Sequence, residues 1–117
     1  MNISHKGLGE LVTTFQTDDE NIQVGDFITI EDNLAIVVTN GKMDGIAVST
    51  SENGYVGVQI GGYAETKYSG STPYTGTDYI EATSASSVSV STSATTDGRL
   101  VQVIYVDTDS KRVGFIL

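Results

Sequence analysis

The chain has 117 residues, enough for one ordinary hydrophobic core and too few for a second full-sized domain. Six basic residues stand against fifteen acidic ones, and the net charge of -9 opposes binding to nucleic acid or to an anionic membrane. The absence of cysteine excludes disulfides, thiol nucleophiles and the usual sulfur-ligated zinc sites, and a single histidine leaves little material for catalysis. The start of the chain has no apolar run long enough for a signal peptide or a membrane span. We therefore expect an intracellular protein that is not an enzyme.

The composition favours an all-β protein. Thirteen glycines, one proline and many serines and threonines predict short strands joined by tight turns. The expected fold is a small β-sandwich or partly open β-barrel of about eight to ten short antiparallel strands, with an extended N-terminal arm. Apolar residues make up 38% of the chain, below the usual value of about 45–50%. The core is therefore expected to be thin or to be shared with a partner.

Residues 1–20 differ from the rest and are predicted to form an arm and a first strand, while residues 21–117 form a single β domain. Within the arm, residues 11–15 have the β-propensity of a strand. Two interpretations remain open for this strand. Either residues 2–15 become ordered by adding a strand to another protein, or residues 11–15 are the first strand of the domain's own sheet. The apolar side chains that need a cover are Leu8, Leu11, Val12 and Phe15.

Apolar runs bounded by turn residues predict strands along the first half of the domain, at residues 27–30, 34–39, 45–49 and 55–60. The second of these runs is apolar almost throughout, which predicts a strand buried on both faces. Asn40-Gly41 is the strongest hairpin signal in the chain, because a type I′ turn needs positive φ at both central positions. Residues 52–54 predict another hairpin turn. In the strand that follows, Val56, Val58 and Ile60 alternate onto one face.

In the second half, strands are predicted at residues 63–68, 79–82, 100–106 and 112–117, and the last two form a C-terminal hairpin. The Ser/Thr-rich segment 84–96 contains Val88 and Val90 at strand spacing, which predicts an edge strand flanked by turns. The segment from Gly25 to Ile60 resembles the segment from Gly76 to Leu117 in its turn residues and their offsets. This similarity suggests two pseudo-repeated halves, although any hairpin-rich chain shows some such similarity.

No motif predicts a catalytic, cofactor or metal site. His5 has no carboxylate nearby in the sequence, so a solvent-exposed terminal histidine is the favoured interpretation. The run Asp107-x-Asp109-x-Lys111 is similar to the start of a calcium loop, but Arg112 stands where such a loop needs glycine, so a charged hairpin turn is favoured. Lys42-Met43 invites comparison with the carrier lysine of biotinyl domains, whose lysine has methionine on both sides. Here Gly41 precedes the lysine, and the carrier hypothesis is the weakest of those considered.

Tyrosines are dense around the segment from Gly62 to Gly76. Tyrosine supplies a large contact area with a polar tip, which suits protein interfaces and stacking on sugars. An interface is therefore predicted at Tyr63, Tyr68 and Tyr74. The alternative for each of them is an ordinary side chain on an amphipathic strand.

Several segments resemble a family of small phage-encoded proteins. They are residues 7–15, Val24-Gly25-Asp26, Tyr55 to Tyr63, Tyr68 to Pro73, Val103 to Asp107 and Val113 to Leu117. These segments are similar to the capsid decoration (cement) proteins that are encoded beside the major head protein in tailed phages and prophages of Gram-positive bacteria. The resemblance spans nearly the whole chain and consists of turn glycines and strand patterns.

The resemblance implies a structural protein, made in the host cytoplasm, that binds the outer surface of the expanded phage head and reinforces it. It implies the major capsid protein as partner and a symmetric cluster, expected to be a homotrimer, on the virion. The capsid-binding residues are then expected to be Leu8, Leu11, Val12 and Phe15, with no cofactor and no contact to nucleic acid or membrane. The alternative function is a carbohydrate- or receptor-binding β-module on a virion or cell surface, which would use the tyrosine-rich segment.

Overall fold

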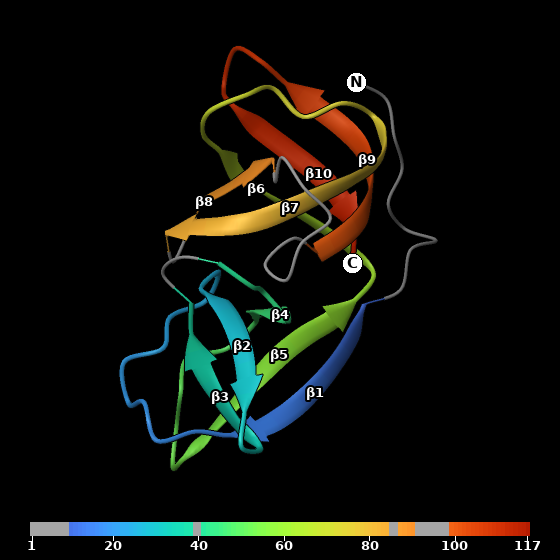
Figure 1. Ribbon diagram of the computed structural model, residues 1–117. Coiled ribbons are helices and arrows are strands. Elements are labelled where there is room, and N and C mark those ends of the chain that lie inside the picture. Colours follow the sequence, from blue (N-terminus) through green and yellow to red (C-terminus); the bar gives the residue numbers. More distant parts are fainter. Residues whose placement is uncertain (1–9, 39–40, 85–86, 91–98) are drawn as a thin grey trace.

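In the part of the chain that the structure describes, ten strands form two five-stranded sheets, each closed into a barrel (Figure 1). The computed structural model describes residues 10–38, 41–84, 87–90 and 99–117, and this part of the chain contains no helix. Barrel 1 consists of β1 (Leu11–Gln16), β2 (Phe27–Glu31), β3 (Leu34–Val37), β4 (Gly45–Ala47) and β5 (Tyr55–Gly61). Barrel 2 consists of β6 (Tyr63–Tyr68), β7 (Gly76–Ser84), β8 (Ser87–Val90), β9 (Arg99–Asp107) and β10 (Arg112–Ile116). The expected all-β class is confirmed.

The two barrels have the same topology. The strand order is β1-β3-β2-β4-β5 in barrel 1, and in barrel 2 it is β6-β8-β7-β9-β10 read around the ring. In each barrel the first and third strands pair in parallel, and every other pair of neighbours is antiparallel. The predicted repeat is thereby confirmed, and it includes β1 and β6 as well as the later strands. The strands are antiparallel as expected except for this one parallel pair in each barrel, because five strands cannot alternate in direction all the way around a closed ring.

Local turn chemistry explains two of the hairpins in barrel 1. Asp32 and Asn33 have positive φ angles of 50° and 67° between β2 and β3, as a type I′ turn requires. Asn53 and Gly54, with φ angles of 53° and 81°, make the corresponding turn before β5. Here Glu52 and its partner across the turn exchange two backbone hydrogen bonds of 2.8 and 3.0 Å. These polar turns lie where the sequence predicts them.

The hairpin predicted at Asn40-Gly41 is not formed. Its two flanking strands, β3 and β4, do not pair with each other, because both pair with β2, on its opposite edges. Asn40 lies outside the described residues. Gly41 instead exchanges backbone hydrogen bonds of 2.8 and 2.9 Å with Ala82 on β7. The connection between β3 and β4 therefore links barrel 1 to barrel 2.

Two further expectations are corrected. The strand predicted over residues 34–39 ends at Val37 and is not buried on both faces, because Ile36 lies outside the closed barrel and is 39% exposed. β8 is not an edge strand, because it pairs with β7 on one side and with β6 on the other. Closure of the barrel thus gives the serine-rich strand two neighbours, and Val88 is fully buried.

The hydrophobic core is divided unequally between the barrels. The first-barrel core contains residues of barrel 1 alone: Ile22, Ile28, Ala35, Ala47, Val56 and Val58. A larger cluster, the shared core, fills barrel 2 and includes Phe27, Val38, Met43 and Ile46 from barrel 1. Phe27 and Ile28 are adjacent on β2 and both fully buried, yet they belong to different clusters, since successive strand residues face opposite ways. One strand therefore contributes to both cores.

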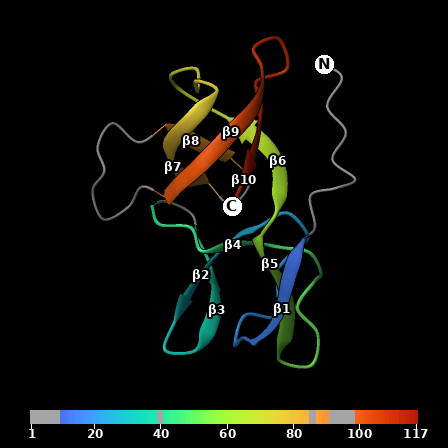
Figure 2. The ribbon, with the colours of Figure 1, turned by 90° about the vertical axis from the view of Figure 1, so that its right-hand side faces the viewer.

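The junction between the barrels is short and hydrogen-bonded. Gly62, with a φ angle of 89°, separates β5 from β6. The side-chain amide of Gln59, which is only 5% exposed, donates to the carbonyl oxygens of Gly61 and Tyr63 at 3.0 and 2.8 Å. The backbone N–H of Leu117 donates to Gly62 at 3.0 Å, so the end of the chain lies at the same junction (Figure 2).

Candidate functional site

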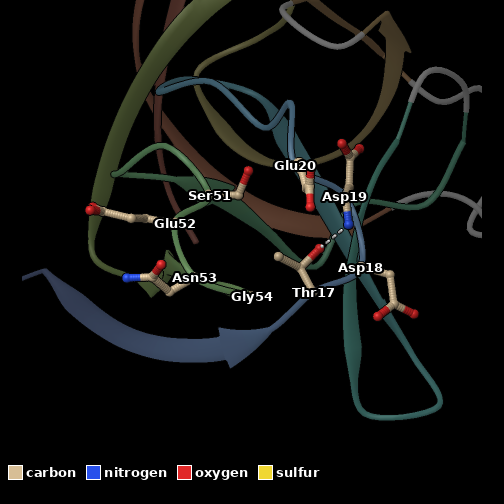
Figure 3. Close-up of a pocket in the computed structure, with 8 residues that line it drawn as sticks. All are labelled: Thr17, Asp18, Asp19, Glu20, Ser51, Glu52, Asn53 and Gly54. Atoms are coloured by element: carbon tan, nitrogen blue, oxygen red, sulfur yellow. Dashed lines mark hydrogen bonds between the residues drawn. The ribbon is translucent and has the colours of Figure 1, made fainter.

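A hollow of about 560 Å³ lies at the far end of barrel 1 and is lined by acidic and small polar residues (Figure 3). The carboxylates of Asp18, Asp19 and Glu52 point in different directions there. Thr17 has a structural role, because its hydroxyl group donates to the carbonyl oxygen of Ala35 and its backbone N–H donates to that of Gly54. Among the described residues no group of three or more carboxylates and histidines is placed to hold a metal ion. This hollow therefore lies between two loops, and its carboxylates do not converge on a common point.

The acidic run before β10 is a hairpin turn, as predicted. The Asp107 carboxylate accepts hydrogen bonds from the backbone N–H groups of Asp109 and Ser110 at 3.0 and 3.3 Å. A hydrogen bond with the Ser110 side chain, followed by these two backbone bonds, holds the pKa of Asp107 below its usual value. Lys111 ends the turn with a φ angle of 55°.

Lys42 is exposed and does not lie on a hairpin. Its ammonium group is 3.5 Å from the carboxylate of Asp44. Burial of Asp44 acts to raise its pKa, but hydrogen bonds from the Ile30 N–H (2.8 Å) and the Thr29 hydroxyl (3.0 Å), together with the Lys42 charge, outweigh burial and lower it. Asp44 therefore ties the β3–β4 connection to β2.

The predicted capsid-binding residues occupy different environments. Of the two interpretations of residues 11–15, the structure shows a strand of the chain's own sheet, because β1 pairs with β5 from Leu11 to Gln16. Leu11 and Val12 remain 59% and 44% exposed. Phe15 is half-buried against the first-barrel core. Leu8, like His5, lies outside the described residues.

The three tyrosines predicted at an interface also differ in their exposure to solvent. Tyr74 is 80% exposed on the β6–β7 loop, whereas Tyr68 is 3% exposed and belongs to the shared core. Tyr68 therefore does not lie at the surface; its ring faces the ammonium group of Lys111 at 5.7 Å. Tyr63 is partly buried against its own barrel. The sequence pattern could not distinguish these three environments, because each depends on which strands are neighbours.

The two barrels carry an equivalent glycine at the centre of one outer face. Gly57 on β5 lies opposite Thr14 of β1, and Gly114 on β10 lies opposite Glu65 of β6. Val12 precedes Thr14 by two residues, and Tyr63 precedes Glu65 by two residues. Val12 and Tyr63 therefore occupy equivalent positions. The sequence signal is the dipeptide Val-Gly at residues 56–57 and again at 113–114, which the sequence analysis did not use.

In barrel 2 this glycine is covered by the chain itself. The Tyr63 ring lies over Gly114 so closely that an added Cβ would overlap the hydroxyl group and come within 2.8 Å of Cζ. The Tyr63 hydroxyl donates to one oxygen of Glu65 at 3.1 Å, and Nε of Arg112 donates to the other at 2.9 Å. Burial, followed by the adjacent Glu65 carboxylate, raises the pKa of Tyr63 to about 12. We call this surface the covered face.

In barrel 1 the equivalent glycine has no aromatic cover. An added Cβ at Gly57 would meet Val48 at 3.3 Å and Val12 at 3.8 Å, and both valines are partly exposed, at 37% and 44%. Tyr55 is 55% exposed on the same strand. Beside Gly57 lies an open groove of about 260 Å³, lined by residues that include Thr14, Ser49, Thr50, Glu52 and Tyr55. We call this surface, with Val12, Val48 and the groove, the open face.

Charge is also distributed unequally. Residues 10–62 contain nine acidic residues and one lysine, a net charge of -8, whereas residues 63–117 contain six acidic and four basic residues, a net charge of -2. Three of those basic residues, Lys67, Lys111 and Arg112, lie together, since Lys67 pairs with Arg112 across β6 and β10. The open face therefore belongs to the strongly acidic barrel.

A comparison with models of known protein families finds no match for this chain, and comparisons with curated proteins and with solved structures find no significant match either. Within the described ranges, no helix could span a membrane.

Proposed function

We propose that the protein is a non-catalytic capsid decoration protein, which binds the outer surface of a phage head through the major capsid protein and stabilises the shell. The resemblance of its turn glycines and strand patterns to the cement proteins of tailed phages supports this proposal. The structural observation that supports it best is the exposure of Leu11 and Val12, which are adjacent on a strand of a closed barrel. Apolar side chains held together on rigid strands are typical of surfaces that bind another protein.

Leu11 and Val12 replace the longer arm as the proposed capsid contact. Both belong to β1 and need no further ordering on binding, so the contact avoids the cost of about 1–2 kcal/mol per residue of fixing a mobile backbone. Phe15 supports them from the barrel interior rather than meeting the capsid. On the head we propose that copies cluster as trimers.

The alternative, a carbohydrate- or receptor-binding module, has less support. Stacking on sugars needs exposed aromatic rings. In the tyrosine-rich segment Tyr68 is buried and Tyr63 packs on Gly114, which leaves Tyr74 as the largely exposed ring among those predicted there.

The test is co-sedimentation with expanded capsids that lack this protein. We expect saturable binding by the wild type and at least about a tenfold loss of affinity for the double variant Leu11→Ser/Val12→Ser, as for central apolar contacts in other interfaces. The matched control is Ile36→Ser, which removes a similarly exposed apolar side chain from another strand of barrel 1. Absence of wild-type binding would refute the function, and equal loss in the control would refute the proposed surface.

A further inference from the structure

The open face of barrel 1 has a counterpart in the same chain, the covered face of barrel 2, which shows how such a face is completed. In barrel 2 an aromatic ring, that of Tyr63, lies over Gly114. In barrel 1 the equivalent position holds Val12, which is not aromatic and is 44% exposed, and an open groove lies beside Gly57. The open face therefore lacks one aromatic side chain relative to its counterpart.

An unused aromatic side chain is present on the other barrel. Tyr74 is 80% exposed, the highest exposure of any large apolar side chain in the described residues. It follows Pro73, which is buried and whose ring restricts its own φ angle. The loop from Ser69 to Thr75 contains no charged residue, so the acidic surroundings of barrel 1 do not repel it.

Tyr74 cannot reach the groove of its own chain. The β6–β7 loop lies at the end of barrel 2 farthest from barrel 1, and the turn before β5 lies at the opposite end of the molecule (Figures 1 and 2). The longest dimension of the molecule is 38 Å. A contact between these two surfaces must therefore join two copies of the chain.

We propose that Tyr74 of one copy inserts into the groove beside Gly57 of a second copy. This is a head-to-tail contact, which forms a closed ring when the rotation between copies permits it. An aromatic side chain buries roughly 150–250 Å² in such a site.

The charge distribution favours this arrangement over a symmetric pair of open faces. Two barrel 1 surfaces in contact would bring together two units of net charge -8. The head-to-tail contact instead places barrel 1 against the barrel that carries Lys67, Lys111 and Arg112. It identifies the surfaces for the clustering proposed above and in that sense rests on the proposed function, but its test needs no capsid.

The first experiment is sedimentation equilibrium of the full chain. We expect concentration-dependent self-association that Tyr74→Ala weakens at least about tenfold, and that Tyr74→Phe preserves. Because Tyr74 is exposed, thermal unfolding of the Tyr74→Ala monomer should match the wild type, which shows that the loss is one of contact and not of folding. A strictly monomeric wild type, or association insensitive to Tyr74→Ala, overturns the proposal.

The second experiment identifies the contact by cross-linking, which the absence of native cysteine makes specific. A mixture of Thr50→Cys and Thr75→Cys proteins, treated with a short bismaleimide, should give the mixed dimer. The control mixture, Glu31→Cys with Thr75→Cys, places the first cysteine at another exposed site of barrel 1 and should not. Equal yields from the two mixtures overturn the proposal. Capsid binding that depends on Tyr74 without any cross-link also overturns it, because Tyr74 would then contact the shell, and this outcome leaves the proposed function intact.

Discussion

Barrel 1 and barrel 2 share one topology but differ in what completes them. Barrel 2 covers its central glycine with its own Tyr63, and its core is enlarged by side chains such as Phe27 from barrel 1. Barrel 1 has a smaller core of its own, carries most of the negative charge, and leaves Gly57 beside an open groove. One topology is therefore compatible with two different packings over the same outer face. Barrel 2 is self-contained on its outer face, and barrel 1 leaves the equivalent face uncovered.

The largest change in stability is expected for a substitution that tests whether the two cores unfold together. Phe27→Ala removes a fully buried side chain of the shared core and should lower the free energy of unfolding by about 3–5 kcal/mol. Since Phe27 belongs to barrel 1 and packs in the core of barrel 2, backbone NMR signals from both barrels should disappear at the same, lowered urea concentration. If barrel 2 signals persist after those of barrel 1 have gone, the cores are independent.

The next effect compares the two glycines. Gly114→Ala forces the Tyr63 ring off the covered face and should cost about 1–3 kcal/mol by urea denaturation. The Cβ of Gly57→Ala would meet the Val48 methyl and Ser49 hydroxyl groups at 3.3 and 3.4 Å and Val12 at 3.8 Å, and alanine is also favoured over glycine in a strand. Its cost should therefore be below about 1 kcal/mol. Equal costs would mean that the two faces are packed alike.

Acid sensitivity should depend on Asp44 in barrel 1. Its folded pKa is lowered, so its contribution is present above the unfolded value near 3.9 and is lost as the pH falls through the folded pKa. Asp44→Asn should cost about 1–2 kcal/mol at pH 7 and should flatten the stability profile below about pH 4. Asp107→Asn, on the β9–β10 turn, is the matched variant and should have the smaller effect. The reverse order would place the acid-sensitive contact in barrel 2.

The loss of stability at alkaline pH should depend on Tyr63 of barrel 2, and the titration of this residue should not affect the free energy of unfolding at neutral pH. The folded pKa of Tyr63, about 12, lies above the unfolded value near 10. Between these values the unfolded chain loses a proton that the folded chain retains, so stability is full below about pH 10 and falls as the pH rises. Tyr63→Phe should reduce that fall, measured by urea midpoints across this range, and an unchanged slope would argue against a tightly held Tyr63 hydroxyl group.

Local chemistry made much of this fold predictable. The turns at Asp32-Asn33 and Asn53-Gly54 and the strand at Tyr63–Tyr68 follow from residues within a few positions of each other. What could not be predicted depends on partners distant in the chain. β3 and β4 both pair with β2, so the strong signal at Asn40-Gly41 makes no hairpin. Parallel pairing to β6 gives the serine-rich strand β8 its second neighbour.

The candidate site was predictable to a similar extent. Exposure of Val12 and Tyr74 agrees with a binding role, whereas the burial of Tyr68 depends on the shared core that two barrels build together. The open face could not be predicted from the sequence, because its distinguishing feature is the absence of an aromatic side chain over Gly57. Its signal was the recurrence of Val-Gly at residues 56–57 and 113–114, which becomes informative only when strand pairing shows the two glycines to be equivalent.

The most direct measurement uses a variant in which an aromatic side chain is introduced over Gly57 of barrel 1, as Tyr63 already lies over Gly114 in barrel 2. Val12→Tyr places a tyrosine at the position equivalent to Tyr63, and an upfield ring-current shift of the Gly57 Hα signals would show that the ring covers the glycine. With that shift present, we predict that sedimentation equilibrium shows a monomer and that binding to expanded capsids falls at least about tenfold. Undiminished self-association and capsid binding by this variant, with its ring over Gly57, would contradict the assignment of the open face as the binding surface.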